Sequence, residues 1–295
     1  MHALNFTRNV HDKDPSYGFQ FLPFDPQFGY GYVNWADVDV LWNVGFFFNA
    51  NRIIEQIKTR NPGMKVVNMW CGSDILETEQ VLNQSPQAKT LLFKDIDEHV
   101  TDWVGFQREI KEKFGIESKY VPSIPARPMA PKPLPKEFTI AVYMPRERLD
   151  FFQYGTILTV AKTFPKTSFH LFPSHKLSGR EQAPPASKNM HFMDFVQGRE
   201  KEDWWAKSSV LIVIPVHGSI SVTGIEFMQM GRAVITNQEA PYMMQANTPE
   251  QIVGSLQTVK KRKQPDRRAS QYYIDEFSPK TQLEHTLQIL RSCSS

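Results

Sequence analysis

The feature that most constrains this chain is a proline-rich segment near its middle. Residues 121–136 read VPSIPARPMAPKPLPK, with prolines at positions 122, 125, 128, 131, 133 and 135. Each proline fixes φ and removes a backbone donor, so neither a helix nor a central strand can form there. The segment predicts a semi-rigid linker between two domains. We place an N-terminal domain at 1–125, the linker at 126–137 and a C-terminal domain at 138–295, with a last helix able to pack back on the N-terminal domain.

Both sides of the linker alternate short apolar runs with amphipathic stretches. Upstream, the pattern predicts strands at 38–44 and 65–69 and helices at 47–59 and 99–114. Downstream, it predicts strands at 138–144, 168–172, 210–215 and 233–236, and helices at 154–164, 198–206 and 222–230. Two such βαβ arrays predict an α/β fold of two doubly wound domains that face one another across a cleft. Ligands of such sheets bind beyond the carboxyl ends of the strands.

Composition excludes several classes of protein. Hydrophobic residues make up 41% of the 295 residues and aromatic residues 12%, which is enough apolar surface to rule out a disordered chain. No apolar run reaches the length of about 18 residues that a membrane-spanning helix needs. The N-terminus lacks the basic and apolar regions of a secretory signal, and the 2 cysteines are too few for a disulfide framework. We therefore expect a cytoplasmic protein, without a transmembrane segment and peripheral to a membrane or to DNA at most.

The segment PVHGSISVTGIEFMQMGRAVITN, residues 215–237, carries the most information about function. A buried strand ends at Pro215, and a turn of small residues leads into a short helix. The start of such a helix exposes backbone N–H groups and the positive end of the helix dipole, which together attract phosphate. Glu226 follows about one turn later, and a carboxylate can accept two hydrogen bonds from the hydroxyl pair of a ribose. This pattern predicts a nucleotide-binding turn.

The same segment resembles the donor-binding motif of GT-B glycosyltransferases, particularly those of the glycosyltransferase family 4 type. The motif of that family pairs two glutamates, of which Glu226 matches the second, while Gly218 replaces the first. Residues 65–74, KVVNMWCGSD, and 114–122, FGIESKYVP, are similar to segments of the family's N-terminal domain. Residues 143–148, YMPRER, occupy the place of a loop whose arginine contacts the donor phosphates. The lysine that usually follows this arginine is absent. The resemblance extends over residues 36–256.

The resemblance implies a GT-B fold of two Rossmann-like domains, a nucleotide-diphosphate sugar as co-substrate, and transfer of the sugar to a hydroxyl with retention of configuration. It assigns catalysis to Arg146, Glu226 and Asp74. The donor-binding positions are Arg146, Arg148, His217, Ser219, Ser221, Val222, Thr223 and Glu226. Asn43 and Asp74 lie at predicted strand ends of the N-terminal domain and would face the acceptor. We expect no other cofactor.

A simpler structural interpretation stands beside each of these roles. Glu226 can be an acid favoured by the helix dipole, Asp74 an N-cap, and Arg146 a surface ion-pair residue. His217 can be a hydrogen-bonded histidine at a strand end, and Cys71 a buried structural thiol. The chain has three Asp-x-Asp triplets, and none follows a strongly apolar strand, so we expect no metal site. These triplets are Asp12/Asp14, Asp37/Asp39 and Asp95/Asp97.

The acceptor stays open between two classes. One is a saccharide or glycolipid. The other is a hydroxylated base of DNA, favoured by residues 260–268, KKRKQPDRR, which carry six basic side chains and one acidic one, and by aromatic residues along 17–35. Solvation of a helix end explains the basic run equally well. An alternative to the enzyme is a catalytically silent GT-B protein that binds a nucleotide or glycan.

Overall fold

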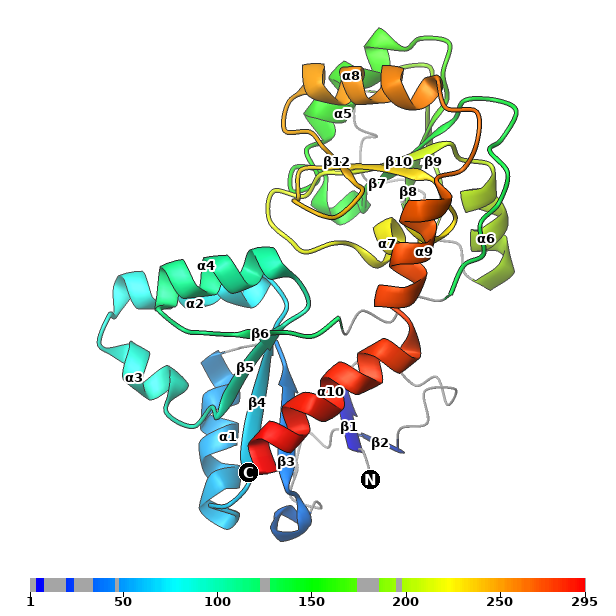
Figure 1. Ribbon diagram of the computed structural model, residues 1–295. Helices are drawn as coiled ribbons and strands as arrows, with labels where there is room; N and C mark the ends of the chain where they lie inside the picture. Colours follow the sequence, from blue (N-terminus) through cyan, green and yellow to red (C-terminus); the bar gives the residue numbers. More distant parts are fainter. Residues whose placement is uncertain are drawn as a thin grey trace.

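The chain forms two α/β domains, one on each side of the proline-rich segment (Figure 1). The computed structural model describes residues 4–7, 20–23, 34–45, 48–122, 128–173, 186–194 and 198–294. Strands β1 (Leu4–Thr7) and β2 (Gln20–Pro23) form a separate parallel pair. Residues 128–135 form neither helix nor strand, as their prolines require. The prediction of an α/β fold with two parallel-sheet domains is confirmed.

The N-terminal domain contains a parallel sheet whose strands lie side by side in chain order, β3-β4-β5-β6. Its strands are β3 (Val40–Val44), β4 (Lys65–Trp70), β5 (Glu98–Thr101) and β6 (Lys119–Tyr120). Its helices are the 3-10 turn η3 (Trp35–Asp37), α1 (Phe48–Arg60), α2 (Ser73–Gln84), α3 (Ala88–Phe93) and α4 (Val104–Phe114). Helices therefore alternate with strands, as the pattern predicts.

One predicted boundary in this domain is wrong. The helix expected over residues 99–114 begins only at Val104, because residues 99–101 belong to strand β5. Val100 and Thr101 are β-branched and fully buried in the sheet, where such side chains pack well. The apolar spacing of the helix continues upstream into the strand by coincidence. The strand therefore ends directly before Asp102.

The C-terminal domain contains a six-stranded parallel sheet in the order β12-β11-β10-β7-β8-β9. The strands are β7 (Ile140–Tyr143), β8 (Phe169–Phe172), β9 (Met190–Phe192), β10 (Val210–Val213), β11 (Ala233–Thr236) and β12 (Met244–Gln245). The helices are the 3-10 turn η4 (Arg146–Arg148), α5 (Tyr154–Thr163), α6 (Gly198–Ala206), α7 (Val222–Gln229), α8 (Pro249–Lys260) and α9 (Arg267–Glu276). The order reverses between β7 and β10, which makes this pair the switch point of a doubly wound sheet.

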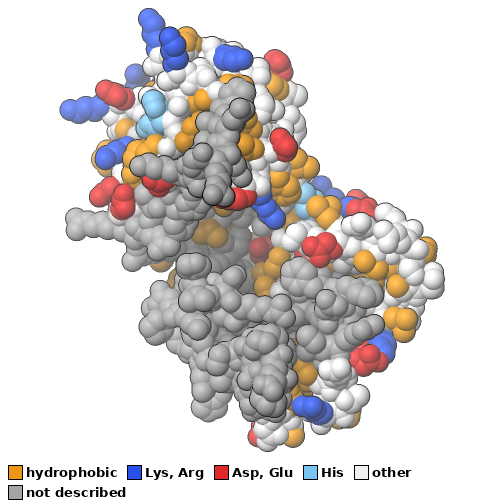
Figure 2. All heavy atoms as spheres, turned by 180° about the vertical axis from the view of Figure 1, so that it is seen from behind, with side chains coloured by type: hydrophobic (Ala, Val, Ile, Leu, Met, Phe, Trp, Pro, Cys, Tyr) orange, Lys and Arg blue, Asp and Glu red, His pale blue; other side chains and the backbone are white. Residues whose placement is uncertain are grey.

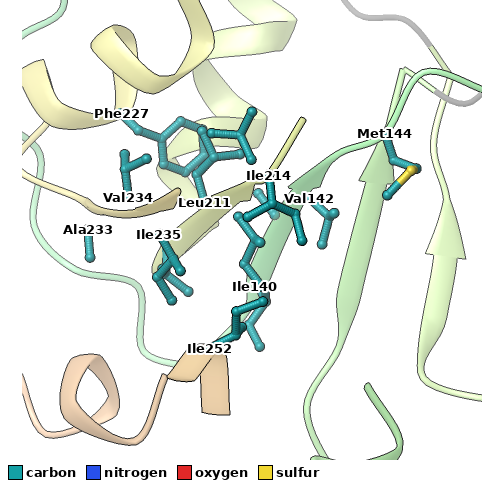
Figure 3. Packing of buried hydrophobic residues seen from close by; sticks show 14 of the residues in the cluster. Ile140, Val142, Met144, Leu211, Ile214, Phe227, Ala233, Val234, Ile235 and Ile252 are labelled. Carbon is teal, nitrogen blue, oxygen red and sulfur yellow. The ribbon is translucent and has the colours of Figure 1, made fainter. Parts of the chain in front are cut away.

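Apolar side chains cover both faces of this sheet. Phe227 of α7 lies on one side and Ile252 of α8 on the other, with residues of the central strands between them (Figure 3). Strands buried on both faces must be apolar along their whole length, and every residue of β10 and β11 is indeed buried. The domain therefore has one continuous core.

The last helix, α10 (Pro279–Ser294), leaves the C-terminal domain and packs on the N-terminal sheet (Figure 1). Its Ile289 and Cys293 are buried in one cluster with Val67, Val100 and Val121. Tyr120 at the end of β6 also donates a hydrogen bond from its hydroxyl to Oε1 of Glu276 in α9, at 3.0 Å. In the part of the chain that the structure describes, the search for a helix long and apolar enough to cross a bilayer finds none.

Candidate functional site

The candidate site lies at the switch point of the C-terminal sheet. Three segments that follow strands meet there through backbone carbonyls. The Val216 N–H donates to the carbonyl of Phe151 at 2.7 Å, and the Asn237 side chain donates to the carbonyl of Pro215 at 2.6 Å. The Gln153 side chain donates to the carbonyl of Ile214 at 3.0 Å. The turn that leads into α7 is therefore held from both neighbouring strands.

Helix α7 begins as the sequence predicts. Ser221 is its N-cap, and the Ser221 hydroxyl accepts a hydrogen bond from the Gly224 N–H at 2.9 Å. Within the residues that the structure describes, the N–H groups of Val222 and Thr223 donate to no protein acceptor. Two of the donors at the start of this helix thus remain available for an anion.

The turn before α7 faces the N-terminal domain. His217 Nε2 lies 2.9 Å from Oε2 of Glu109 in α4, and the His217 ring stacks on Phe106 with 5.4 Å between ring centroids. Burial acts to raise the pKa of Glu109, but hydrogen bonds from His217 and Lys113 outweigh it and hold the pKa below its usual value. Next to this pair, Ser219 lies close enough to the carboxylate of Asp102 to act against the rise in its pKa. His217 and Ser219, both expected to bind the donor, therefore contact the opposite domain.

Further contacts join the two domains beside this turn. The Trp103 indole N–H donates to the carbonyl of Glu239 at 3.1 Å. Arg108 lies 3.3 Å from a carboxylate oxygen of Glu239, and both side chains of this pair are largely exposed. The start of α4 is therefore the surface on which the C-terminal domain rests.

The aromatic contact between Phe106 and His217 depends on a glycine beside the Phe106 ring. Gly72 has φ +108°, and a Cβ on it would lie 2.7 Å from Cζ of Phe106. Only glycine fits both the backbone conformation and the close approach of the ring. The turn is fixed by Asp74, whose Oδ1 accepts hydrogen bonds from the N–H groups of Cys71, Gly72 and Ile75 at 3.0, 2.8 and 3.2 Å. Asp74 is fully buried, so its observed contacts are those of a turn-forming residue.

Asp102 was not among the site residues predicted from the sequence. It follows the last residue of β5, at the carboxyl edge of the N-terminal sheet, and its Oδ1 is buried without a hydrogen-bond partner among the described residues. Burial, together with the nearby charge of Asp74, raises the pKa of Asp102 to about 7. The signal that would have identified it is its place directly after a strand, which the incorrect helix boundary concealed.

Glu226 is buried inside the C-terminal domain, 1% exposed. Its Oε1 lies 2.6 Å from Nζ of Lys201, and its Oε2 accepts a hydrogen bond from the Trp205 indole at 3.0 Å. Both partners belong to α6. Glu226 lies in the second turn of α7, so the interpretation as an acid of the first helical turn does not describe it. Its role towards a ribose stays a prediction.

The remaining predicted residues are placed as follows. Arg148 in η4 lies over the ring of Phe151, 5.2 Å from its centroid, beside the held turn. Arg146 begins η4, and its side chain is outside the described part of the structure. Asn43 donates to Oδ1 of Asn68 at 2.7 Å and to the carbonyl of Gly45 at 2.9 Å, so its described contacts stay within its own domain.

Neither thiol nor metal chemistry is indicated by the described residues. Cys71 is an exposed residue, so its interpretation as a buried structural thiol is wrong. Desolvation of its sulfur by neighbouring groups, with Asp74 and Asp102 nearby, still raises the pKa of the thiol to about 12, which disfavours the nucleophilic thiolate. No group of potential metal ligands is present among these residues. Asp97 instead accepts a hydrogen bond from the Val66 N–H and pairs with Lys58 and Lys65. Asp12 and Asp14 lie outside the described part of the chain.

Comparison with solved structures identifies the arrangement of the two domains. Sucrose-phosphate synthase from Thermosynechococcus elongatus superposes with a TM-score of 0.71 at 12% identity, over 99% of this chain and 88% of its own. TarM superposes with a TM-score of 0.59 at 12% identity, over 84% of this chain and 54% of its own. This chain has a GT-B fold.

A third GT-B neighbour is the pneumococcal O-GlcNAc transferase GtfA, with a TM-score of 0.53 at 13% identity over 81% of this chain and 55% of GtfA. The chain thus spans about half the length of TarM and GtfA. No protein-family model matches the sequence. No curated protein matches it either. The GT-B fold is therefore visible in three dimensions although the sequences have diverged.

Proposed function

We propose that this protein transfers a sugar from a nucleotide-diphosphate donor to a hydroxyl acceptor. The observation that carries the proposal is the junction at the switch point. There, the unpaired N–H groups at the start of α7 follow a turn in which Ser219 lies close to Asp102 of the opposite domain. An anion site on one domain beside an acid on the other suits a donor diphosphate and an acceptor hydroxyl.

The GT-B neighbours support a nucleotide sugar as donor. One structure of a TarM mutant contains UDP, and the GtfA structure contains UDP and GlcNAc. These ligands belong to those proteins, and we extend the ligand class to this chain through the shared fold. The identity of its base and sugar is left to experiment.

The proposed chemistry breaks the bond between the anomeric carbon and the diphosphate oxygen and forms a bond from that carbon to the acceptor oxygen. Negative charge develops on the leaving diphosphate, so donors aimed at it lower the barrier. The N–H groups of Val222 and Thr223 would supply such donors, with Arg146 and Arg148 adding positive charge. The family resemblance favours retention of configuration without a metal, with the acceptor proton passing to the departing phosphate.

We assign Asp102 to the acceptor side of this reaction, in place of Asn43 and Asp74. Asn43 and Asp74 are engaged in contacts within their own domain, whereas Oδ1 of Asp102 has no hydrogen-bond partner among the described residues. A substrate hydroxyl would satisfy this oxygen, since a buried acceptor without a hydrogen bond is costly. Asp102 would thus orient a hydroxyl of the acceptor or of the transferred sugar.

Donor binding and turnover test the proposal in two steps. UDP and GDP are first screened by thermal shift, because a ligand of the folded state raises the midpoint of unfolding. The release of nucleoside diphosphate from UDP- and GDP-sugars is then measured. Glu226→Gln should weaken donor binding. Asp102→Asn should bind the nucleoside diphosphate as well as the natural chain does, but should release it from the nucleotide sugar at least about tenfold more slowly.

Glu112→Gln and Asp39→Asn are matched controls, because both carboxylates are exposed and Asp39 precedes β3, at the edge of the sheet opposite the site. Neither control should change binding or turnover. Equal turnover in Asp102→Asn and Asp39→Asn would remove Asp102 from the mechanism. If no nucleoside diphosphate raises the unfolding midpoint, the donor class is wrong.

A second candidate is a GT-B protein that binds a nucleotide or glycan without catalysis. The observation in its favour is that both oxygens of Glu226 are occupied by Lys201 and Trp205. A ribose would have to displace one of these partners. Stable donor binding with no diphosphate release in the presence of any acceptor would decide for this candidate.

A further inference from the structure

A basic groove lies on the C-terminal domain, away from the candidate site. The linker forms one wall, residues 131–134, and the connection between α8 and α9 with the first turns of α9 forms the other. The groove has a volume of about 620 Å³ and is lined by Lys132, Lys263 and Arg267, with Ser270 and Gln271 as neutral polar groups. In Figure 1 the α8–α9 connection lies at the outer edge of the domain, on the opposite side from helix α4.

Both walls are anchored to the same short segment, the end of α7 and the turn after it. The guanidinium of Arg232 donates to the carbonyls of Lys132 and Pro133 at 3.0 and 2.7 Å. On the other wall, the Asp266 N–H donates to the carbonyl of Gly231 at 2.9 Å, and the Ser270 hydroxyl donates to the carbonyl of Gln229. The groove is therefore a fixed feature of the folded domain.

The charge of this region is not balanced locally. Among the described residues, no carboxylate forms an ion pair with Lys132, Lys263 or Arg267. The acid of the run, Asp266, has a carboxylate oxygen that accepts a hydrogen bond from the Ala269 N–H at the start of α9. Behind the linker wall, Arg232 is fully buried with carbonyls as its described partners. Burial lowers its pKa to about 10, so it keeps its charge at neutral pH.

From these observations we infer that the groove binds the phosphodiester backbone of a nucleic acid. Basic side chains on two fixed walls suit a chain of phosphates that lies along the groove and is held by lysine and arginine contacts. More Lys and Arg side chains lie at the top and outer edge of this domain (Figure 2). The inference goes beyond the proposed transferase and does not depend on it.

A membrane surface fits the groove less well. Peripheral membrane binding uses apolar side chains that enter the headgroup region next to basic ones. The groove lining includes Pro131, Pro133, Leu134 and Pro265, but none of the large hydrophobic side chains that are exposed in the described structure. Of the aromatic side chains along 17–35, the structure describes that of Trp35, which is buried in the N-terminal core and cannot stack on a base.

The test is the salt dependence of binding to labelled single-stranded and duplex DNA of mixed sequence. The groove variant combines Lys132→Gln, Lys263→Gln and Arg267→Gln. For duplex DNA each phosphate contact contributes about 0.9 to the slope of log K against log salt, so the groove variant should lose up to about 2.7 of that slope. At about 50 mM salt its dissociation constant should rise at least about tenfold.

The control variant combines Lys89→Gln, Lys162→Gln and Lys166→Gln, which changes the net charge equally at exposed positions outside the groove. It should keep the slope and the affinity of the natural chain. If both variants lost the same affinity and salt slope, general charge attraction would explain the binding and the inference would be overturned. Binding only to vesicles of phosphatidylcholine and phosphatidylglycerol, or to neither DNA nor vesicles, would also overturn it.

Thermal unfolding of each variant checks that the fold is intact. The nucleotide screen is repeated on the groove variant, which should still bind its nucleoside diphosphate. A groove variant that loses DNA binding but keeps nucleotide binding therefore tests the groove separately from the donor site. Loss of DNA binding together with an unchanged unfolding midpoint supports the groove as the docking surface.

Discussion

The two domains are stabilised by different kinds of core. The C-terminal domain has a single cluster that runs across its sheet and includes helices on both faces. The described residues of the N-terminal domain form three separate clusters, and one of them includes Ile289 and Cys293 of α10, which come from the far end of the chain. The described core of the C-terminal domain thus comes from that domain and the linker, whereas part of the N-terminal core is supplied by a helix from the end of the chain.

The largest expected effect comes from α10. Ile289→Ala should destabilise the protein by about 3 kcal/mol, because it removes a buried side chain and leaves a cavity on the N-terminal sheet. Urea unfolding followed by tryptophan fluorescence measures the change. The matched variant is Leu283→Ala on the same helix, which is 56% exposed and should stay within about 0.5 kcal/mol of the natural chain. Equal effects of the two variants would contradict the dependence of the N-terminal domain on α10.

A smaller loss is expected from Gly72→Ala. The substitution places a Cβ at positive φ and against Phe106, which should cost about 2 kcal/mol. The Phe106 ring would also move away from His217, so nucleotide-dependent activity should fall along with stability.

Gly254→Ala in α8 is the control for this variant. A Cβ at Gly254 meets nothing within 4 Å, and alanine favours a helix by up to about 1 kcal/mol. The control should therefore be neutral or stabilising. A Gly72→Ala protein as stable as the natural chain would show that the turn can adopt another conformation.

The pH dependence of stability should reveal two opposing groups in the N-terminal domain. The pKa of Asp102 is raised to about 7, so the folded state holds this proton more tightly, and stability falls as pH rises from about 4 to 7. Burial lowers the pKa of His99 to about 4, so the unfolded state holds that proton more tightly, and stability rises with pH up to about 6.5.

Asp102→Asn should therefore leave the His99 contribution unopposed. Urea midpoints of this variant should rise more steeply with pH between about 4 and 7 than those of the natural chain. Identical profiles for the two proteins would remove the Asp102 contribution.

The smallest effect is expected at the exposed contact between the domains. Arg108→Ala removes an ion pair with Glu239 whose side chains are 64% and 72% exposed. Such pairs contribute at most about 1 kcal/mol and are screened by salt. The stability difference from the natural chain, measured at low and high salt, should be below about 1 kcal/mol and should vanish at high salt. A loss of several kcal/mol would show that this contact, and not α10, couples the domains.

Much of the fold follows from local pattern. The prolines predict the break between domains, and the apolar strand before Pro215 with the small-residue turn after it predicts a helix that starts at Val222. These features depend on residues close in sequence, whose backbone propensity and hydrogen-bonding capacity are sufficient to predict the local structure. The incorrect start of the 99–114 helix shows what a local pattern cannot decide. Val100 and Thr101 fit the helical spacing, and they become strand residues because β4 and β6 lie beside them.

The sequence by itself determined the alternation of strands and helices and the break at the prolines, and it predicted the turn after β10 as the place for an anion. Only the tertiary structure brings Asp102 close to Ser219 and pairs Glu226 with Lys201. It also makes the linker and α9 the walls of one basic groove. The physical reason is that these contacts join residues far apart in the chain. Their burial, and with it the cost of an unpaired oxygen or an uncompensated charge, exists only after the domains have packed.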